Sequence, residues 1–188
     1  MNDLVILDHA ERFFRYAQNA FSPRKYMSDL SHFDTDGNSQ MVDVGSKPVS
    51  RRLAEASAVV VMKPETLTQI TSGQVNKGDV FEVARIAGIM ATKRTADLIP
   101  LCHPLAIDSV TVSFEIMDEG RLRVSSNVLS TGKTGVEMEA LTSVSIAALT
   151  VYDMCKSVDR EIVVTAVQLE QKSGGKSGLF VRSSSGDP

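Results

Sequence analysis

Charged side chains of opposite sign stand at the two ends of one long uncharged segment. Glu137 and Glu139 open this segment, Asp153 and Lys156 close it, and no charge lies between Glu139 and Asp153. A lysine beside an aspartate can share a proton with it, as acid–base catalysis requires. Acids at a helix start also suit the helix dipole, so stability alone can account for Glu137. It accounts less well for Asp153, because a negative charge near the C-terminal end of a helix interacts unfavourably with the helix dipole.

A glycine-rich segment is a second candidate site. Residues 172–178 read Lys-Ser-Gly-Gly-Lys-Ser-Gly, which suggests a phosphate-binding loop. The P-loop motif itself does not fit, because Glu170 occupies its first glycine position. Lys172 and Lys176 on a flexible backbone can still close over an anion, and a solvated tail is the plain alternative.

Lys77 and His103 are candidate functional residues, but each of them can equally have a purely structural role. Lys77 precedes a predicted helix that Asp79 can cap, so it can be a simple surface charge. His103 follows Leu101 and Cys102 in a loop pinned by two prolines. A single histidine is more often structural than catalytic, but this one lies in a rigid, apolar loop. Cys102 is expected to be a packed thiol, with no base certain to activate it.

The hydrophobic pattern predicts the elements that must hold these side chains. Strands are expected at 56–63, 110–116, 122–128 and 162–169, and helices at 65–70, 79–98 and 133–156. This order predicts an α+β fold, with a ferredoxin-like, four-stranded antiparallel sheet and helices on one face. The other sheet face is too apolar to remain open, so we expect another subunit to cover it.

The length of the last predicted helix constrains where a site can form. Glu139 and Asp153 are fourteen residues apart, which is about 21 Å along a helix. Both ends therefore cannot line one small-molecule pocket in the same subunit. Either there are two sites, or one site combines opposite helix ends of two subunits.

Composition indicates one globular domain with an extension. The 188 residues are 43% hydrophobic, enough to bury the core of a single domain. We expect residues 1–29 to be a linker or partly disordered extension, residues 30–182 to form the domain, and residues 183–188 to be a flexible tail. Arginines in the extension faintly suggest a mitochondrial transit peptide, but its acidic residues speak against one.

Charge and cysteine content exclude several classes of protein. A net charge of −3 offers no surface for nucleic acid. Cys102 and Cys155 lack CxxC spacing, which argues against a disulfide framework and against a metal site. No apolar run has membrane-spanning length, so no membrane association is expected. A cytoplasmic protein is predicted, with the mitochondrial matrix as the alternative.

Seven short segments, in order along the chain, resemble one enzyme family. They are MVDV (41–44), KGDV (77–80), ARIAGI (84–89), LIPLCHP (98–104), TGVEMEALT (134–142), YDMCK (152–156) and KSGGKSG (172–178). Together they resemble the molybdenum cofactor biosynthesis protein C (MoaC) family, whose members are cyclic pyranopterin monophosphate synthases. The likeness covers roughly residues 30–178 and leaves residues 1–29 outside.

The resemblance implies a reaction, an assembly and a set of residues. The expected enzyme is a phosphorus–oxygen lyase that converts (8S)-3′,8-cyclo-7,8-dihydroguanosine 5′-triphosphate to cyclic pyranopterin monophosphate and pyrophosphate by acid–base catalysis, without a cofactor or metal. The family implies a homo-hexamer, a trimer of dimers, with active sites between subunits. Its catalytic residues fall on Asp153, Lys156 and Lys77. Its substrate-binding residues fall on Leu101, Cys102, His103, Glu137, Met138, Glu139, Arg52, Lys172 and Lys176.

Two other classes share the predicted order of strands and helices. RNA-recognition modules need aromatic residues on their central strands, and residues 122–129 have none. A regulatory domain that binds a nucleotide without turning it over stays open on pattern alone.

Overall fold

The computed structural model describes residues 34, 36–75 and 78–183. The chain forms two compact units, Met1–Val42 and Asp43–Pro188. In the described part of the first unit, the Asp34 carboxylate accepts hydrogen bonds from the backbone N–H groups of Asp36 and Asn38, at 2.9 and 2.8 Å. The predicted extension, residues 1–29, lies outside the described residues. Every element named below belongs to the second unit.

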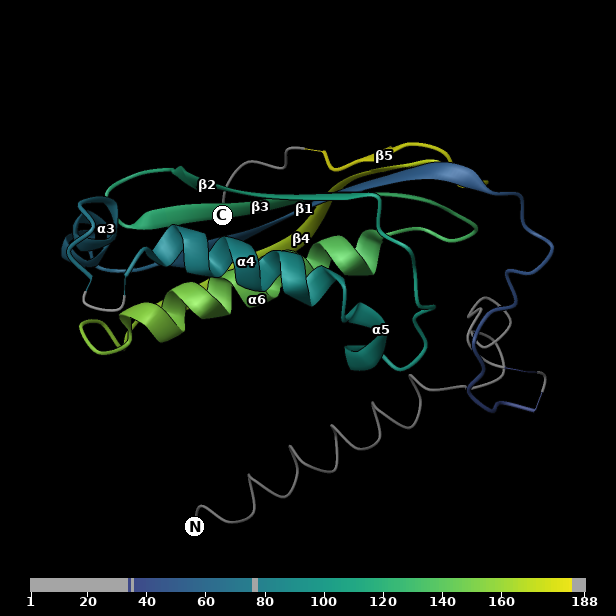
Figure 1. Ribbon diagram of the computed structural model, residues 1–188, viewed down its shortest axis with the longest axis horizontal. Helices are drawn as coiled ribbons and strands as arrows, with labels where there is room; N and C mark the ends of the chain where they lie inside the picture. The colour runs from purple at the N-terminus through teal and green to yellow at the C-terminus, as the bar shows by residue number, and fades with distance from the viewer. Residues whose placement is uncertain (1–33, 35, 76–77, 184–188) are drawn as a thin grey trace, which may run out of the picture. The chain divides into compact units, whose positions relative to one another are not determined.

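Within the described residues, the second unit contains one five-stranded sheet (Figure 1) in the order β2-β3-β1-β4-β5. Its strands are β1 (Ser50–Val61), β2 (Ser109–Ile116), β3 (Arg121–Gly132), β4 (Val163–Ser173) and β5 (Phe180–Val181). All neighbouring strands pair antiparallel. The predicted α+β class is therefore confirmed.

The predicted number of four strands is wrong. Strand β5 adds a fifth at the edge, where Val181 pairs with Gln171 and Phe180 pairs with Lys172. A strand of two residues is too short to produce the alternation by which strands are recognised in sequence. The glycine-rich segment 172–178 is therefore the end of β4 and the turn that leads into β5.

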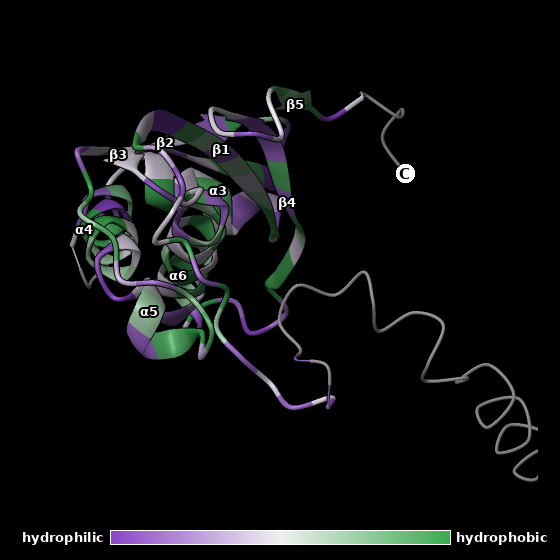
Figure 2. Cartoon of the chain, turned by 90° about the vertical axis from the view of Figure 1, so that its right-hand side faces the viewer, coloured by the Kyte–Doolittle hydropathy of each residue, from purple (hydrophilic) through white to green (hydrophobic). Residues whose placement is uncertain are grey.

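Two helices cover one face of the sheet. Helix α6 (Glu137–Cys155) lies against β1, β3 and β4, and α4 (Val80–Thr92) lies against α6 and β2. The end view in Figure 2 shows both helices on the same side of the sheet. The shorter helices are α3 (Pro64–Thr71) and α5 (Thr95–Leu98). The single helix predicted at 79–98 is thus two helices, although Asp79 caps the first as predicted, by accepting a hydrogen bond from Glu82 N at 3.1 Å.

Small side chains let α6 pack closely on the sheet and on α4. Along β1 and α6 the fully buried residues include Ala54, Ala56, Ala58, Ala140, Ala147 and Ala148. A Cβ added to Gly88 of α4 would lie 3.1 Å from the carbonyl oxygen of Ser143 in α6. Valines fill the remaining space, and each one buried contributes about 1.5–3 kcal/mol. The core therefore fixes the position of α6, and with it the side chains at both of its ends.

The opposite sheet face is only partly apolar, and no helix of the described residues covers it. Ser57 is buried near its centre and donates a hydrogen bond to Glu170 at 2.5 Å. Gln168 donates a second hydrogen bond to Glu170 at 2.9 Å. Half-buried Leu53 and Leu129 pair beside this network. The prediction that another subunit covers this face stays a prediction.

Candidate active site

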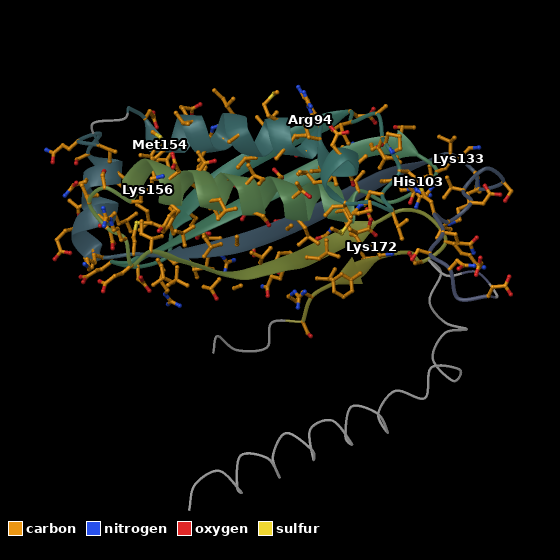
Figure 3. All side chains as sticks on the ribbon, turned by 90° about the horizontal axis from the view of Figure 1, so that it is seen from below. Arg94, His103, Lys133, Met154, Lys156 and Lys172 are labelled. Carbon is orange, nitrogen blue, oxygen red and sulfur yellow. The ribbon has the colours of Figure 1, made fainter. Side chains whose placement is uncertain are left out.

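Helix α6 separates the predicted site residues into two groups. Figure 3 shows Lys156 at one end of the sheet and helix layers and His103, Lys133 and Lys172 at the other. The helix runs unbroken through both Glu139 and Asp153. These residues are therefore about 21 Å apart along the helix axis, as the sequence indicated.

The C-terminal end of α6 carries an ion pair between Asp153 and Lys156. Lys156 Nζ lies 2.5 Å from Asp153 Oδ1, and both side chains are more than half exposed. The hydrogen bond to Asp153, followed by its negative charge, raises the pKa of Lys156. Lys156 is therefore a protonated donor at neutral pH, and Asp153 is positioned to exchange a proton with it or with a bound molecule.

Asp159 anchors the chain where it leaves this helix end. Its buried carboxylate accepts hydrogen bonds from Lys63 N at 2.9 Å, Thr66 Oγ1 at 3.1 Å and Glu161 N at 3.1 Å. The hydrogen bond from Lys63 N is the main cause of the lowered pKa of Asp159. Asp159 thereby ties the end of α6 to the start of α3. Sequence analysis did not identify it, because a lone aspartate in a loop carries no motif.

The N-terminal end of α6 contains a buried carboxyl group. Glu139 is only 4% exposed, and burial, with some repulsion from Glu137, raises its pKa. No ion-pair partner of Glu139 lies among the described residues. Burial, and then the charge of Glu139, also raises the pKa of the Cys102 thiol. Cys102 is half-buried and lies near Glu139, and its predicted role as a packed thiol stays a prediction.

The glycine-rich segment lies at the same end of α6, where its backbone contacts Arg52. The Arg52 guanidinium donates from Nε to the carbonyl of Gly132 at 3.2 Å and from Nη2 to the carbonyl of Lys133 at 3.0 Å. A Cβ placed on Gly175 would overlap Arg52 Nη1, so the backbone of the segment lies directly on this arginine. Lys172 donates a hydrogen bond to Ser177 within the segment.

Lys133 is a further cation at this end, one that sequence analysis missed. Its Nζ donates a hydrogen bond to the carbonyl of Gly45 at 2.5 Å, and its own carbonyl binds Arg52. Its position inside the TGKTG sequence before α6 was the only available signal. The predicted site residue Lys77 lies outside the described residues.

The sequence model of the MoaC family matches residues 41–175. The chain belongs to the MoaC family. All the predicted site residues except Lys176, one position past the match, lie within this MoaC region. The predicted family is therefore confirmed.

Curated members of the MoaC family align over most of the chain. A protein of Mycobacterium tuberculosis named cyclic pyranopterin monophosphate synthase 1 is 54% identical over 83% of this chain and 92% of its own length. Proteins named cyclic pyranopterin monophosphate synthase from Pelotomaculum thermopropionicum and Desulfitobacterium hafniense are 56% and 53% identical, over 83% and 82% of this chain and 92% and 94% of their own lengths. All three organisms are bacteria, so these relatives give no support to the mitochondrial alternative.

No helix among the described residues is both long enough and apolar enough to cross a membrane.

Proposed function

We propose that this chain is a cyclic pyranopterin monophosphate synthase, a lyase of molybdenum cofactor biosynthesis. The observation that carries the proposal is the 54% identity to a synthase of that name over 83% of the chain. The 156 aligned residues are enough to include both ends of α6. The proposed substrate is (8S)-3′,8-cyclo-7,8-dihydroguanosine 5′-triphosphate, and the products are cyclic pyranopterin monophosphate and pyrophosphate.

The proposed proton transfers belong to Asp153, Lys156 and Lys77. Rearrangement of the cyclised nucleotide opens one ring and closes another, which requires groups that donate and accept protons. Lys156 is protonated beside Asp153, at 2.5 Å, and its raised pKa means that this ion pair must open before Lys156 acts as a general acid. Asp153 suits a base, because a carboxylate that stops accepting the hydrogen bond from Lys156 can take a proton from the substrate. Lys77 joins this set on the family resemblance alone.

The N-terminal end of α6 is the proposed binding end. Pyrophosphate leaves from a triphosphate, so cations must neutralise its charge as it departs. Arg52, Lys172 and Lys176 are proposed for this role. The ring system would lie against the side chains around the buried carboxyl group, which are Leu101, Cys102, His103, Glu137, Met138 and Glu139.

We propose that each active site combines the two ends from different subunits of a homo-hexamer, a trimer of dimers. A pocket for one nucleotide cannot extend over the roughly 21 Å between Glu139 and Asp153 within one helix. Exposed apolar side chains on the helix layer also favour contact with another copy. They include Val83, Ile86, Met90 and Leu149.

We propose further that the second unit is a ferredoxin-like domain. Its four longer strands lie in the order β2-β3-β1-β4, with helices between β1 and β2 and between β3 and β4. This connectivity agrees with the split βαβ arrangement. Strand β5 would then be an addition at the β4 edge.

The deciding experiment is turnover by the purified chain. Incubation with the cyclised dihydro-GTP should yield cyclic pyranopterin monophosphate and pyrophosphate in equal amounts. An Asp153→Asn variant purified in parallel controls for contaminating enzyme. If the chain binds the nucleotide and never converts it, the regulatory-domain alternative is correct and the proposed function is wrong.

A further inference from the structure

We propose that Arg52 is a positioning residue that holds two active-site segments in register with each other. The first is the helix-entry loop, residues 132–136, which leads from the last residue of β3 into α6. The second is the glycine-rich segment, residues 172–178. The proposal rests on the proposed function for its consequence in catalysis, but its geometry is independent of the reaction.

Arg52 points to the α6 side of the sheet. Side chains alternate along a strand, and Ala54 and Ala56 of β1 are buried under the helices. Arg52 belongs to this same alternating set and is half-buried, whereas Arg51 belongs to the opposite set and is exposed. Only Arg52 therefore extends from β1 toward the start of α6.

The guanidinium of Arg52 fixes the helix-entry loop by main-chain contacts. Its Nε and Nη2 donate to the consecutive carbonyls of Gly132 and Lys133, at 3.2 and 3.0 Å. Two parallel donors in one plane are a property of arginine that the single ammonium group of lysine cannot reproduce. These carbonyls stand where β3 ends, so the contact sets the direction of the chain into α6 and the placement of Lys133.

The opposite edge of the same guanidinium supports the glycine-rich segment. Gly175 has a φ of +73°, and a Cβ there would overlap Nη1 of Arg52. Gly174 has a φ of +93°, and a Cβ there would overlap the carbonyl oxygen of Arg51. Both space and backbone conformation thus require glycine at these positions. Gly178 differs, because its φ is +65° but nothing lies within 4 Å of an added Cβ.

One arginine therefore touches both segments. The helix-entry loop carries Lys133, and the glycine-rich segment carries the proposed phosphate-binding residues Lys172 and Lys176. Arginine has five N–H donors, and two of them serve the helix-entry loop. A role as a charge alone would require only that a cation be present at position 52. A positioning role requires the shape of the guanidinium and the absence of a side chain at Gly175.

The test compares Arg52→Lys and Gly175→Ala with the matched controls Arg51→Lys and Gly73→Ala. Arg52→Lys keeps the charge. Gly73 lies outside both segments, has a φ of +70° and has nothing within 4 Å of an added Cβ, so Gly73→Ala has the backbone strain of Gly175→Ala without the overlap. We expect each test variant to lower kcat/KM by about 10- to 100-fold, while the controls stay within about threefold of the wild type. The double variant should lose little more than either single one, because both changes break the same contact. Wild-type kcat/KM in Arg52→Lys, or fully multiplicative losses in the double variant, would overturn the proposal.

Amide hydrogen exchange without substrate tests the geometry without relying on turnover. Arg52→Lys should raise exchange in peptides that cover residues 130–136 and also in peptides that cover residues 172–178. Arg51→Lys should change neither. If exchange rises in one segment only, or in neither, the two segments are not held by Arg52. An inactive wild type would refute the proposed function and leave this measurement valid.

Discussion

The two ends of α6 present their functional groups in different ways. At the C-terminal end, Asp153 and Lys156 are exposed side chains that hold each other at 2.5 Å. At the N-terminal end, Glu139 is buried and Arg52 is fixed by backbone carbonyls and by the glycine-rich segment. The N-terminal end, which is the proposed binding end, is thus preorganised within one subunit, whereas the C-terminal end, which is the proposed acid–base end, is exposed to solvent. This difference agrees with the proposed active site shared between subunits, because an exposed acid–base pair needs a second surface to exclude water from it.

The largest effect is expected from Asp153→Asn. Loss of a general acid–base group lowers turnover by about 10²–10⁴-fold, and the exposed position makes a change in folding small. Steady-state turnover and the thermal midpoint should be measured together. Asp97→Asn is the control, because Asp97 is also an exposed partner in an ion pair, with Arg94 at 3.6 Å. Turnover near the wild-type value in Asp153→Asn would remove the acid–base end from the mechanism.

Oligomers assembled from a mixture of two inactive variants should recover part of the wild-type activity. Asp153→Asn leaves the proposed binding end intact, and His103→Ala leaves the proposed acid–base end intact. After unfolding, mixing and reassembly, some interfaces will contain two intact ends if the site is shared, so activity should reach roughly a quarter of the wild type when assembly is random. A mixture of Asp153→Asn with Lys156→Ala is the control, because both changes lie at the same end. Mixed oligomers that form and stay inactive would contradict the shared site.

Stability at the acid–base end should depend on Asp159. Asp159→Ala leaves the N–H groups of Lys63 and Glu161 and the hydroxyl of Thr66 without their acceptor, which should cost about 3 kcal/mol in the free energy of unfolding. The pKa of Asp159 is lowered in the folded state, so its contribution is present above the ordinary aspartate pKa and is lost as the pH falls through the lowered value. Urea unfolding of the wild type and the variant should therefore converge in acid. A difference that is constant with pH would show that the carboxylate charge is not involved.

Glu139 should have the opposite pH dependence. Its pKa is raised by burial, so folding favours the protonated form, and the folded state loses stability as the pH rises through the ordinary glutamate pKa toward the raised one. Glu139→Gln removes this loss, so the variant should gain thermal stability relative to the wild type as the pH increases. Glu137→Gln is the matched control for removal of a carboxylate in the same helical turn. Equal pH profiles for the wild type and Glu139→Gln would show that burial does not raise the pKa of Glu139.

Periodic elements were predictable from the sequence, and long-range contacts were not. The pattern placed the last helix at 133–156 and a strand at 110–116, close to the observed α6 (Glu137–Cys155) and β2 (Ser109–Ile116). Strand β1 was predicted to begin six residues late, at Ala56, because Arg51, Arg52 and Glu55 interrupt its apolar alternation. Pairing with β3, not composition, makes that part of the chain a strand.

The site was predictable where a family motif marks it. Arg52 was predicted as a charge for the triphosphate, but its contacts to carbonyls 80 and 81 residues away have no local signature. The same holds for Asp159, whose partner Lys63 N lies 96 residues away in the chain. Such side-chain to main-chain hydrogen bonds depend on the packing of the whole sheet. Sequence patterns therefore predict which groups could react, and these roles stay predictions, but the patterns do not reveal the side chains that hold the main chain in place.

The smallest effect is expected from deletion of residues 1–29. The family match begins at residue 41, and every candidate residue at either end of α6 lies beyond it. If one end supplies binding and the other supplies proton transfer, neither needs the extension, and kcat/KM should stay within about twofold of the wild type. The assay should be paired with the oligomeric state by light scattering, so that a loss of assembly is not taken for a loss of chemistry. Loss of activity from an intact oligomer would mean that residues 1–29 contribute to catalysis at one of the two ends of α6.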